Sequence, residues 1–185
     1  SPKFLVKEYY KEKNRKLEID YINLSKSYKE TDKFTDKEIQ TFLNENSDKL
    51  KQDYIDFSYV LITPRNLIGL EEFNQAFFDK IDEIENKISK NITYSSIITE
   101  LNIKPTSKKN YINLENKKTI ENMIYNSRND KMQILEDDGS FIFYQIERIN
   151  NKLPSLSNAK FKKQIKNLLF QKEKFEFNKN ILDQI

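Results

Sequence analysis

Residues 132–149 of the chain read MQILEDDGSFIFYQIERI. Two runs rich in aliphatic and aromatic residues, 132–135 and 141–149, lie on either side of the four residues DDGS. An Asp-Gly pair favours the positive φ angles that a tight hairpin turn requires. We therefore predict that this stretch forms two antiparallel strands joined by a short turn.

A third strand is predicted upstream, from Tyr54 to Thr63. This segment is dense in aromatic and β-branched residues, and its continuous apolar run YVLI at 59–62 indicates cover on both faces of a sheet. Pro64 ends the strand, because proline cannot donate a hydrogen bond to a neighbouring strand. We expect the three strands to share one antiparallel sheet.

Helices are predicted between these strands. Residues 71–89 carry an apolar stripe at three- and four-residue spacing, which is typical of a helix that packs on a core: Phe73, Phe77, Ile81, Ile84 and Ile88. One or two helical turns are expected at 95–101 and a shorter helix at 114–125. Residues 102–114, which contain Pro105, are expected to be extended or irregular.

The segment before the first of these strands has the clearest helix start. Thr35 followed by Glu38 is a capping box, and the helix is expected to run from Asp36 to about Lys49. Further upstream, residues 4–14 are predicted to be helical. Leu17, Ile19 and Tyr21 alternate with acidic residues and predict a half-buried strand.

At the other end of the chain, a long helix is expected from Ser155 to about residue 184. The predicted fold is therefore α+β: a small antiparallel sheet covered by helices, flanked by an N-terminal strand-helix segment and a long C-terminal helix. We divide the chain into residues 1–52, 53–152 and 153–185.

Composition restricts the function. The chain has 185 residues with 32 basic and 29 acidic side chains, a net charge of only +3, and the two signs are interleaved. Nucleic-acid-binding domains usually gather positive charge into a patch, so we expect no nucleic-acid partner. The acidic pairs are interpreted as helix starts and turn residues, and neither a metal nor a cofactor is expected.

The absence of two residue types excludes further chemistry. The chain has no cysteine and therefore no disulfide, and no histidine, the commonest general base and metal ligand. No apolar run approaches the roughly 20 residues that a membrane-spanning helix needs. Because the chain begins with Ser-Pro-Lys within a charged pattern, we interpret it as a fragment whose membrane anchor, if present, lies outside it.

Four segments, taken in order, resemble one family of folding proteins. They are RKLEIDYINL…FTDKEIQTFLNENSDKLK within 15–51, FSYVLI at 57–62, DDGSFIFYQIERI at 137–149, and the helical pattern from Phe161 to Ile185. Residues 54–149 resemble a parvulin-type peptidyl-prolyl isomerase domain, and the flanks resemble its neighbours in the SurA/PpiD-type periplasmic foldases.

The resemblance implies a degenerate site. Active parvulins place one histidine on the first strand and another on the last, and the aligned positions here hold Tyr59 and Phe141. We therefore assign no catalytic residue. A groove for extended peptides is expected to be lined by Tyr59, Leu61, Met123, Phe141 and Phe143.

The function implied is that of a periplasmic folding chaperone, tethered to the inner membrane in the full-length protein. It would bind unfolded or nascent exported polypeptides, and the apolar C-terminal helix could mediate a homodimer. Two alternatives stay open at this point: an active peptidyl-prolyl cis-trans isomerase, and a structural or surface interaction domain.

Overall fold

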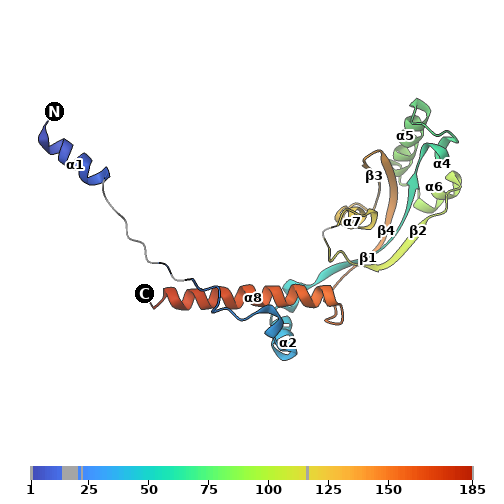
Figure 1. Ribbon diagram of the computed structural model, residues 1–185. Coiled ribbons are helices and arrows are strands. Elements are labelled where there is room, and N and C mark those ends of the chain that lie inside the picture. Colours follow the sequence, from blue (N-terminus) through green and yellow to red (C-terminus); the bar gives the residue numbers. More distant parts are fainter. Residues whose placement is uncertain (1, 14–20, 22, 116, 185) are drawn as a thin grey trace. The chain divides into compact units, whose positions relative to one another are not determined.

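A computed structural model describes the chain except for residues 1, 14–20, 22, 116 and 185. Its elements are shown in Figure 1. Two residues of the predicted N-terminal strand, Leu17 and Ile19, lie outside the described residues. The third, Tyr21, belongs to no helix or strand and is exposed.

The chain forms two compact units. One comprises Ser1–Phe34 together with Asn167–Ile185, and the other comprises Thr35–Lys166. The domain boundaries predicted after residues 52 and 152 both fall inside the second unit.

The second unit is built on a four-stranded antiparallel sheet with the strand order β2-β1-β4-β3. Its strands are β1 (Gln52–Ile62), β2 (Thr106–Tyr111), β3 (Met132–Asp137) and β4 (Ser140–Lys152). The predicted sheet is confirmed: β3 and β4 contain two of the expected strands, and β1 contains the third except for Thr63, which caps α4. The hairpin turn also forms as expected, with Asp138 and Gly139 at φ +48° and +74°.

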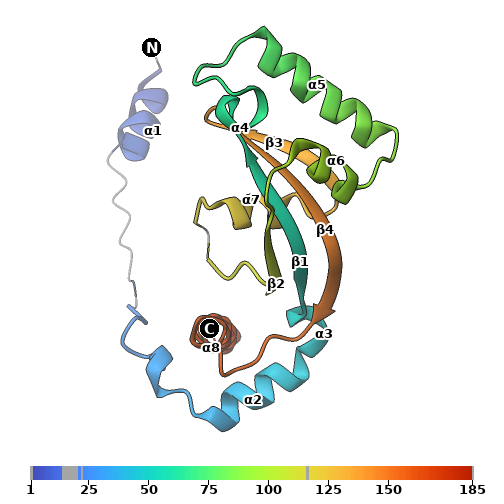
Figure 2. The same ribbon diagram turned by 90° about the vertical axis from the view of Figure 1, so that its right-hand side faces the viewer.

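Helices cover both faces of this sheet (Figure 2). On one face, α4 (Pro64–Ile68), α5 (Gln75–Ser89) and α6 (Tyr94–Leu101) pack on the sheet. Their core includes Val60, Ile62, Phe77, Ile81, Ile84, Ile97, Phe141 and Phe143. On the other face, α7 (Ile120–Asn126) packs on a second core made of Ile55, Phe57, Ile124, Tyr125, Ile142, Tyr144 and Ile146.

Local capping fixes where α4 and α5 begin. Thr63 and Asn66 form a capping box around Pro64, whose fixed φ suits the first helical position, and Gly69 ends α4 at φ +72°. The side chain of Asn74 accepts a hydrogen bond from the backbone N–H of Phe77 and starts α5. The helix predicted from residue 71 therefore begins at Gln75, and the sequence reading missed α4.

The second unit also contains α2 (Asp36–Glu45), α3 (Ser47–Leu50) and the first turns of α8 (Ala159–Leu182). The predicted capping box of Thr35 and Glu38 is present. The helix expected to reach Lys49 is divided at Asn46, whose side-chain and backbone N–H groups both bond to the Phe42 carbonyl. Lys162 of α8 pairs with Asp36 of α2 at 2.7 Å.

A buried carboxylate marks a bulge in the middle of the sheet. The pairing register of β1 shifts next to Asp56 on both sides, toward β2 and toward β4. Asp56 accepts a hydrogen bond from the backbone N–H of Asn110 (2.7 Å), which has the left-handed φ of +50°, and two from Arg148 (3.0 and 2.6 Å). The carboxylate thus holds three strands at the irregular position.

The first unit contains α1 (Lys3–Lys13), a short 3-10 turn (Thr31–Lys33) and the remainder of α8. The long C-terminal helix is confirmed, although it starts at Ala159 rather than at Ser155. Asn158 sets this start, because its side-chain oxygen accepts from the backbone N–H groups of Lys160 and Phe161. No residue of α1 is buried.

Candidate functional site

Strand register decides which of the predicted site residues share a face. Tyr59 lies opposite Tyr144, and Leu61 lies opposite Ile142. Directly opposed residues of an antiparallel pair point to the same side of a sheet. Because Tyr144 and Ile142 belong to the core under α7, Tyr59 and Leu61 belong to that side as well.

Phe141 and Phe143 point to the other side of the sheet. They lie opposite Ile62 and Val60 and are buried in the core beneath α5 and α6. The structure therefore does not bring the five predicted residues together. Tyr59, Leu61 and Met123 form one group, and the two phenylalanines are core residues of the opposite face.

We call the partly exposed apolar side chains on this side of the sheet the α7 face: Tyr59, Leu61, Ile120, Met123 and Leu135. Leu61 is 42% exposed, whereas Ile142 opposite it is buried. The other four pack against the core under α7 while remaining partly open. Sequence reading missed Ile120 and Leu135, although the two-residue turn at Asp138 and Gly139 places Leu135 opposite Ile142.

α7 is tied firmly to β1. Thr119 caps its N-terminus, and Tyr125 donates a hydrogen bond from its hydroxyl to the Asp53 carbonyl at 2.9 Å. Arg128 bonds the Asp53 carboxylate at 2.8 Å and lies over the Tyr125 ring, 4.5 Å from its centroid. These contacts fix the position of Met123 beside the sheet.

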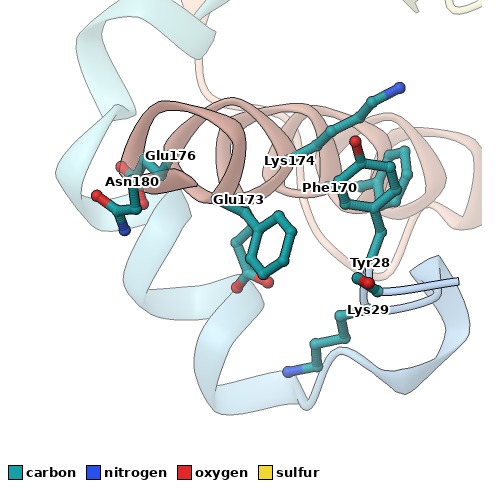
Figure 3. A pocket seen from close by; sticks show the side chains of 9 residues that line it. Tyr28, Lys29, Phe170, Glu173, Lys174, Glu176 and Asn180 are labelled. Atoms are coloured by element: carbon teal, nitrogen blue, oxygen red, sulfur yellow. The ribbon is translucent and has the colours of Figure 1, made fainter. Parts of the chain in front are cut away.

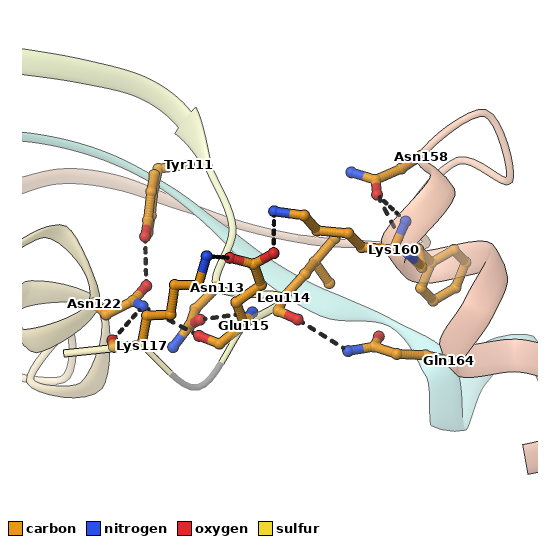
Figure 4. Close-up of polar contacts among 10 residues, drawn as sticks. Tyr111, Asn113, Leu114, Glu115, Lys117, Asn122, Asn158, Lys160 and Gln164 are labelled. Atoms are coloured by element: carbon orange, nitrogen blue, oxygen red, sulfur yellow. Dashed lines mark hydrogen bonds and ion pairs between the residues drawn. The ribbon is translucent and has the colours of Figure 1, made fainter. Parts of the chain in front are cut away.

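The loop between β2 and α7 is held by one buried amide, as Figure 4 shows. The Asn122 side chain accepts a hydrogen bond from the Tyr111 hydroxyl and donates to the carbonyls of Glu115 (3.1 Å) and Lys117 (2.7 Å). Glu115 in turn pairs with Lys117 and Lys160. A polar pocket of about 220 Å³ lies here, and both of its lysines, Lys117 and Lys160, pair with its single carboxylate, Glu115.

Tyr59 occupies the position at which the resemblance places the first-strand histidine. Its ring stacks on Phe57 with a centroid distance of 6.0 Å. Burial, followed by the nearby Glu121 carboxylate, raises the pKa of the Tyr59 hydroxyl above its usual range. The hydroxyl therefore stays protonated at neutral pH, so it can donate a hydrogen bond to a peptide carbonyl.

A second pocket, of about 310 Å³, lies within the first unit (Figure 3). Tyr28 packs edge-on against Phe170 and Phe177 and donates a hydrogen bond to the Asn178 side chain at 2.8 Å. Lys174 lies over the Tyr28 ring. These contacts hold the segment around Tyr28 against α8, and they provide packing partners for two aromatic side chains of that helix, Phe170 and Phe177.

Searches for related proteins found no matching family, no matching curated protein and no matching solved structure. Within the described residues, no helix is long and apolar enough to span a membrane. Among the described residues, no three or more side chains of the types that bind metals are grouped so that they could hold a metal ion. The candidate site is thus defined by its geometry alone.

Proposed function

We propose that the chain is a folding-assistance domain of the SurA/PpiD type, with the α7 face as the site that binds unfolded segments of exported proteins. The observation that carries the proposal is this face itself: an apolar sheet surface that α7 covers only in part, with Leu61 exposed and with Tyr59 and Met123 partly exposed against one core. Unfolded polypeptides offer the apolar side chains that such a surface can bury.

The strand order supports the same proposal. Helices α4 to α6 after β1, then α7 and the β3–β4 hairpin, agree with the order of strand, helices and hairpin expected for the segment that resembles a parvulin domain. The resemblance aligns Tyr59 of the α7 face with the first-strand histidine of active parvulins, but it aligns the last-strand histidine with Phe141, which does not lie on this face. Phe141 is buried on the opposite side of the sheet, so it cannot contact a peptide bound at the α7 face.

The proposal predicts binding without isomerisation. We expect the protein not to accelerate cis/trans exchange of an Ala-Pro-Phe peptide, measured by NMR exchange spectroscopy, because catalysis requires groups that favour the twisted amide over the ground state. We expect it to slow aggregation of an unfolded outer-membrane-type protein, measured by light scattering. Affinity for an uncharged aromatic peptide should be micromolar or weaker, since a flexible peptide loses entropy on binding.

Two exposed leucines make a matched test of the site. Leu61→Ser should weaken binding of the uncharged peptide roughly fivefold, as expected when the exposed part of one leucine is no longer buried. Leu182→Ser on α8, where the leucine is 71% exposed, should leave it unchanged. Fluorescence anisotropy at two salt concentrations should give equal affinities, because the contacts are apolar.

Two results would contradict this proposal. Equal effects of the two leucine substitutions would remove the α7 face as the site. Rapid exchange of the proline peptide that Tyr59→Phe abolishes would instead make Tyr59 a catalytic group and the domain an active isomerase.

A further inference from the structure

A cluster of four phenylalanine rings lies where the α4–α5 loop meets α5. Phe77 and Phe141 are its buried members, and Phe73 and Phe78 are 47% and 43% exposed. The two exposed rings stack with centroids 6.3 Å apart, and each contacts both buried rings at 4.9–6.3 Å. Leu70, in the same loop, is also half-exposed.

The exposed rings are not needed to fill the core. The buried side of α5 is occupied by Phe77, Ile81 and Ile84, which pack on the sheet. Phe73 precedes the capping residue of the helix, and Phe78 lies beside Phe77 but faces outward. A contiguous exposed group of large apolar side chains commonly marks an interaction site.

The charge around these rings is strongly negative. Residues 71–86 contain six acidic side chains and one lysine, a net charge of −5 within a chain whose net charge is +3. Asp82 and Glu85 follow Phe78 by four and seven residues, so the three share the outer face of α5. Lys80 and Lys87 both pair with Glu83, at 2.6 and 2.9 Å. Arg65 of α4 pairs with Glu71 at 3.5 Å. These cations do not pair with Asp82 or Glu85, so the outer face of α5 beside Phe78 remains acidic.

From these observations we infer that Phe73, Phe78 and Leu70, with the surrounding carboxylates, form a second docking surface, called here the α5 corner. Its partner is a polypeptide segment in which lysine or arginine flanks apolar side chains. The rings bury the apolar side chains, and Asp82 and Glu85 attract the cations. α5 and α7 cover opposite faces of the sheet, so this surface is separate from the α7 face.

The test uses two labelled peptides that alternate Leu and Phe with either Lys or Glu, so that apolar content is equal. In fluorescence anisotropy with the whole chain at low salt, the Lys peptide should bind about tenfold more tightly than the Glu peptide, because like charges replace opposite ones. Raising the salt concentration from about 0.05 M to about 0.5 M should reduce this difference, since exposed charges are screened.

Three variants locate the binding. Phe78→Ser should weaken binding of the Lys peptide about tenfold by removing an exposed aromatic anchor, and Phe175→Ser, which alters an exposed phenylalanine of α8, should not. The double variant Asp82→Asn with Glu85→Gln should abolish the preference for Lys over Glu. It changes only the solvent side of α5, so the fold should be retained.

Two outcomes overturn the inference: equal binding of the two peptides to the unchanged protein, or an undiminished preference for Lys in the double variant. Leu61→Ser separates this inference from the proposed function. If that substitution weakens binding of the Lys peptide as much as Phe78→Ser does, the α7 face is the site for both ligands and the α5 corner is not a docking surface.

Discussion

Asp56 shows how much can depend on one side chain. Asp56 is only 3% exposed. The hydrogen bond from the Asn110 backbone, and to a smaller extent those from Arg148, lower the pKa of its carboxyl group. We expect Asp56→Ala to lower the free energy of unfolding by about 2–3 kcal/mol, as for loss of hydrogen bonds to a charged group. Urea denaturation monitored by circular dichroism would measure this.

The same residue predicts a pH dependence. Because the carboxyl pKa is lowered in the folded state, its contribution is fully present above the unfolded value of about 3.9 and is lost as the pH falls through the folded value. The stability difference between the wild type and Asp56→Ala should therefore shrink below about pH 4. A difference that stays constant down to pH 2 would show that the carboxylate does not hold the bulge.

Tyr94 presents the opposite case. Among the described residues, its hydroxyl is the one buried side-chain polar atom for which no hydrogen-bond partner is found. Its ring packs on Phe143, 4.8 Å between centroids. A buried hydroxyl without a partner costs about 1–3 kcal/mol. Tyr94→Phe should therefore raise the midpoint of urea denaturation, and a lower midpoint would mean that a bound water satisfies the hydroxyl.

Two substitutions compare the start of one helix with the core of another. Thr35→Ala removes the oxygen that accepts from the Glu38 backbone at 3.3 Å and should cost about 1 kcal/mol. Phe77→Ala empties a fully buried site between α5 and the sheet and should cost about 3–5 kcal/mol. Urea melts that rank Thr35→Ala as the more damaging of the two would contradict this assignment of the buried side of α5.

The elements that sequence reading predicted are those with local chemistry of their own. The Asp138-Gly139 turn and the Thr35 capping box each specify backbone geometry within four residues, and both are confirmed. β2 was expected only as part of an extended or irregular segment, because its sequence, TSKKNY, has no apolar alternation and all but its last residue are exposed at the sheet edge. β2 becomes a strand by pairing with β1, which is far away in the sequence, so no local signal predicts it.

The candidate site was predicted only in part for a similar reason. Which face a strand residue occupies depends on its parity relative to its partner strand, and a continuous apolar run such as 59–62 carries no parity signal. The register of β1 against β4 is set by the folded structure. In that register Phe143 points to one side of the sheet and Tyr59 points to the other. Met123 lies on α7 and packs against the same core as Tyr59, and its inward position follows from the helical period of residues 120–124.

At the scale of the second unit, the two proposed surfaces should respond differently to the same solution conditions. The α7 face is apolar, so the affinity for a peptide bound there should not depend on salt. The α5 corner lies in a segment with six carboxylates, so peptide binding there should weaken as the salt concentration rises. An unfolded chain with separate aromatic and cationic-apolar stretches could occupy both. The sheet between them keeps the two surfaces apart.

The pairing of β1 with β4 has a consequence for how the protein itself is made. Gln52 pairs with Lys152 and Ile62 with Phe141, so the centre of the sheet joins residues that are 79 to 100 positions apart in the chain (141 − 62 and 152 − 52). Such distant pairing closes a large loop before any contact forms, which slows folding. During synthesis β1 cannot pair with β4 until β4 has left the ribosome, so this edge of β1 stays unpaired until then. A protein proposed to assist the folding of other chains thus completes the centre of its own sheet only after residue 152 has been synthesised.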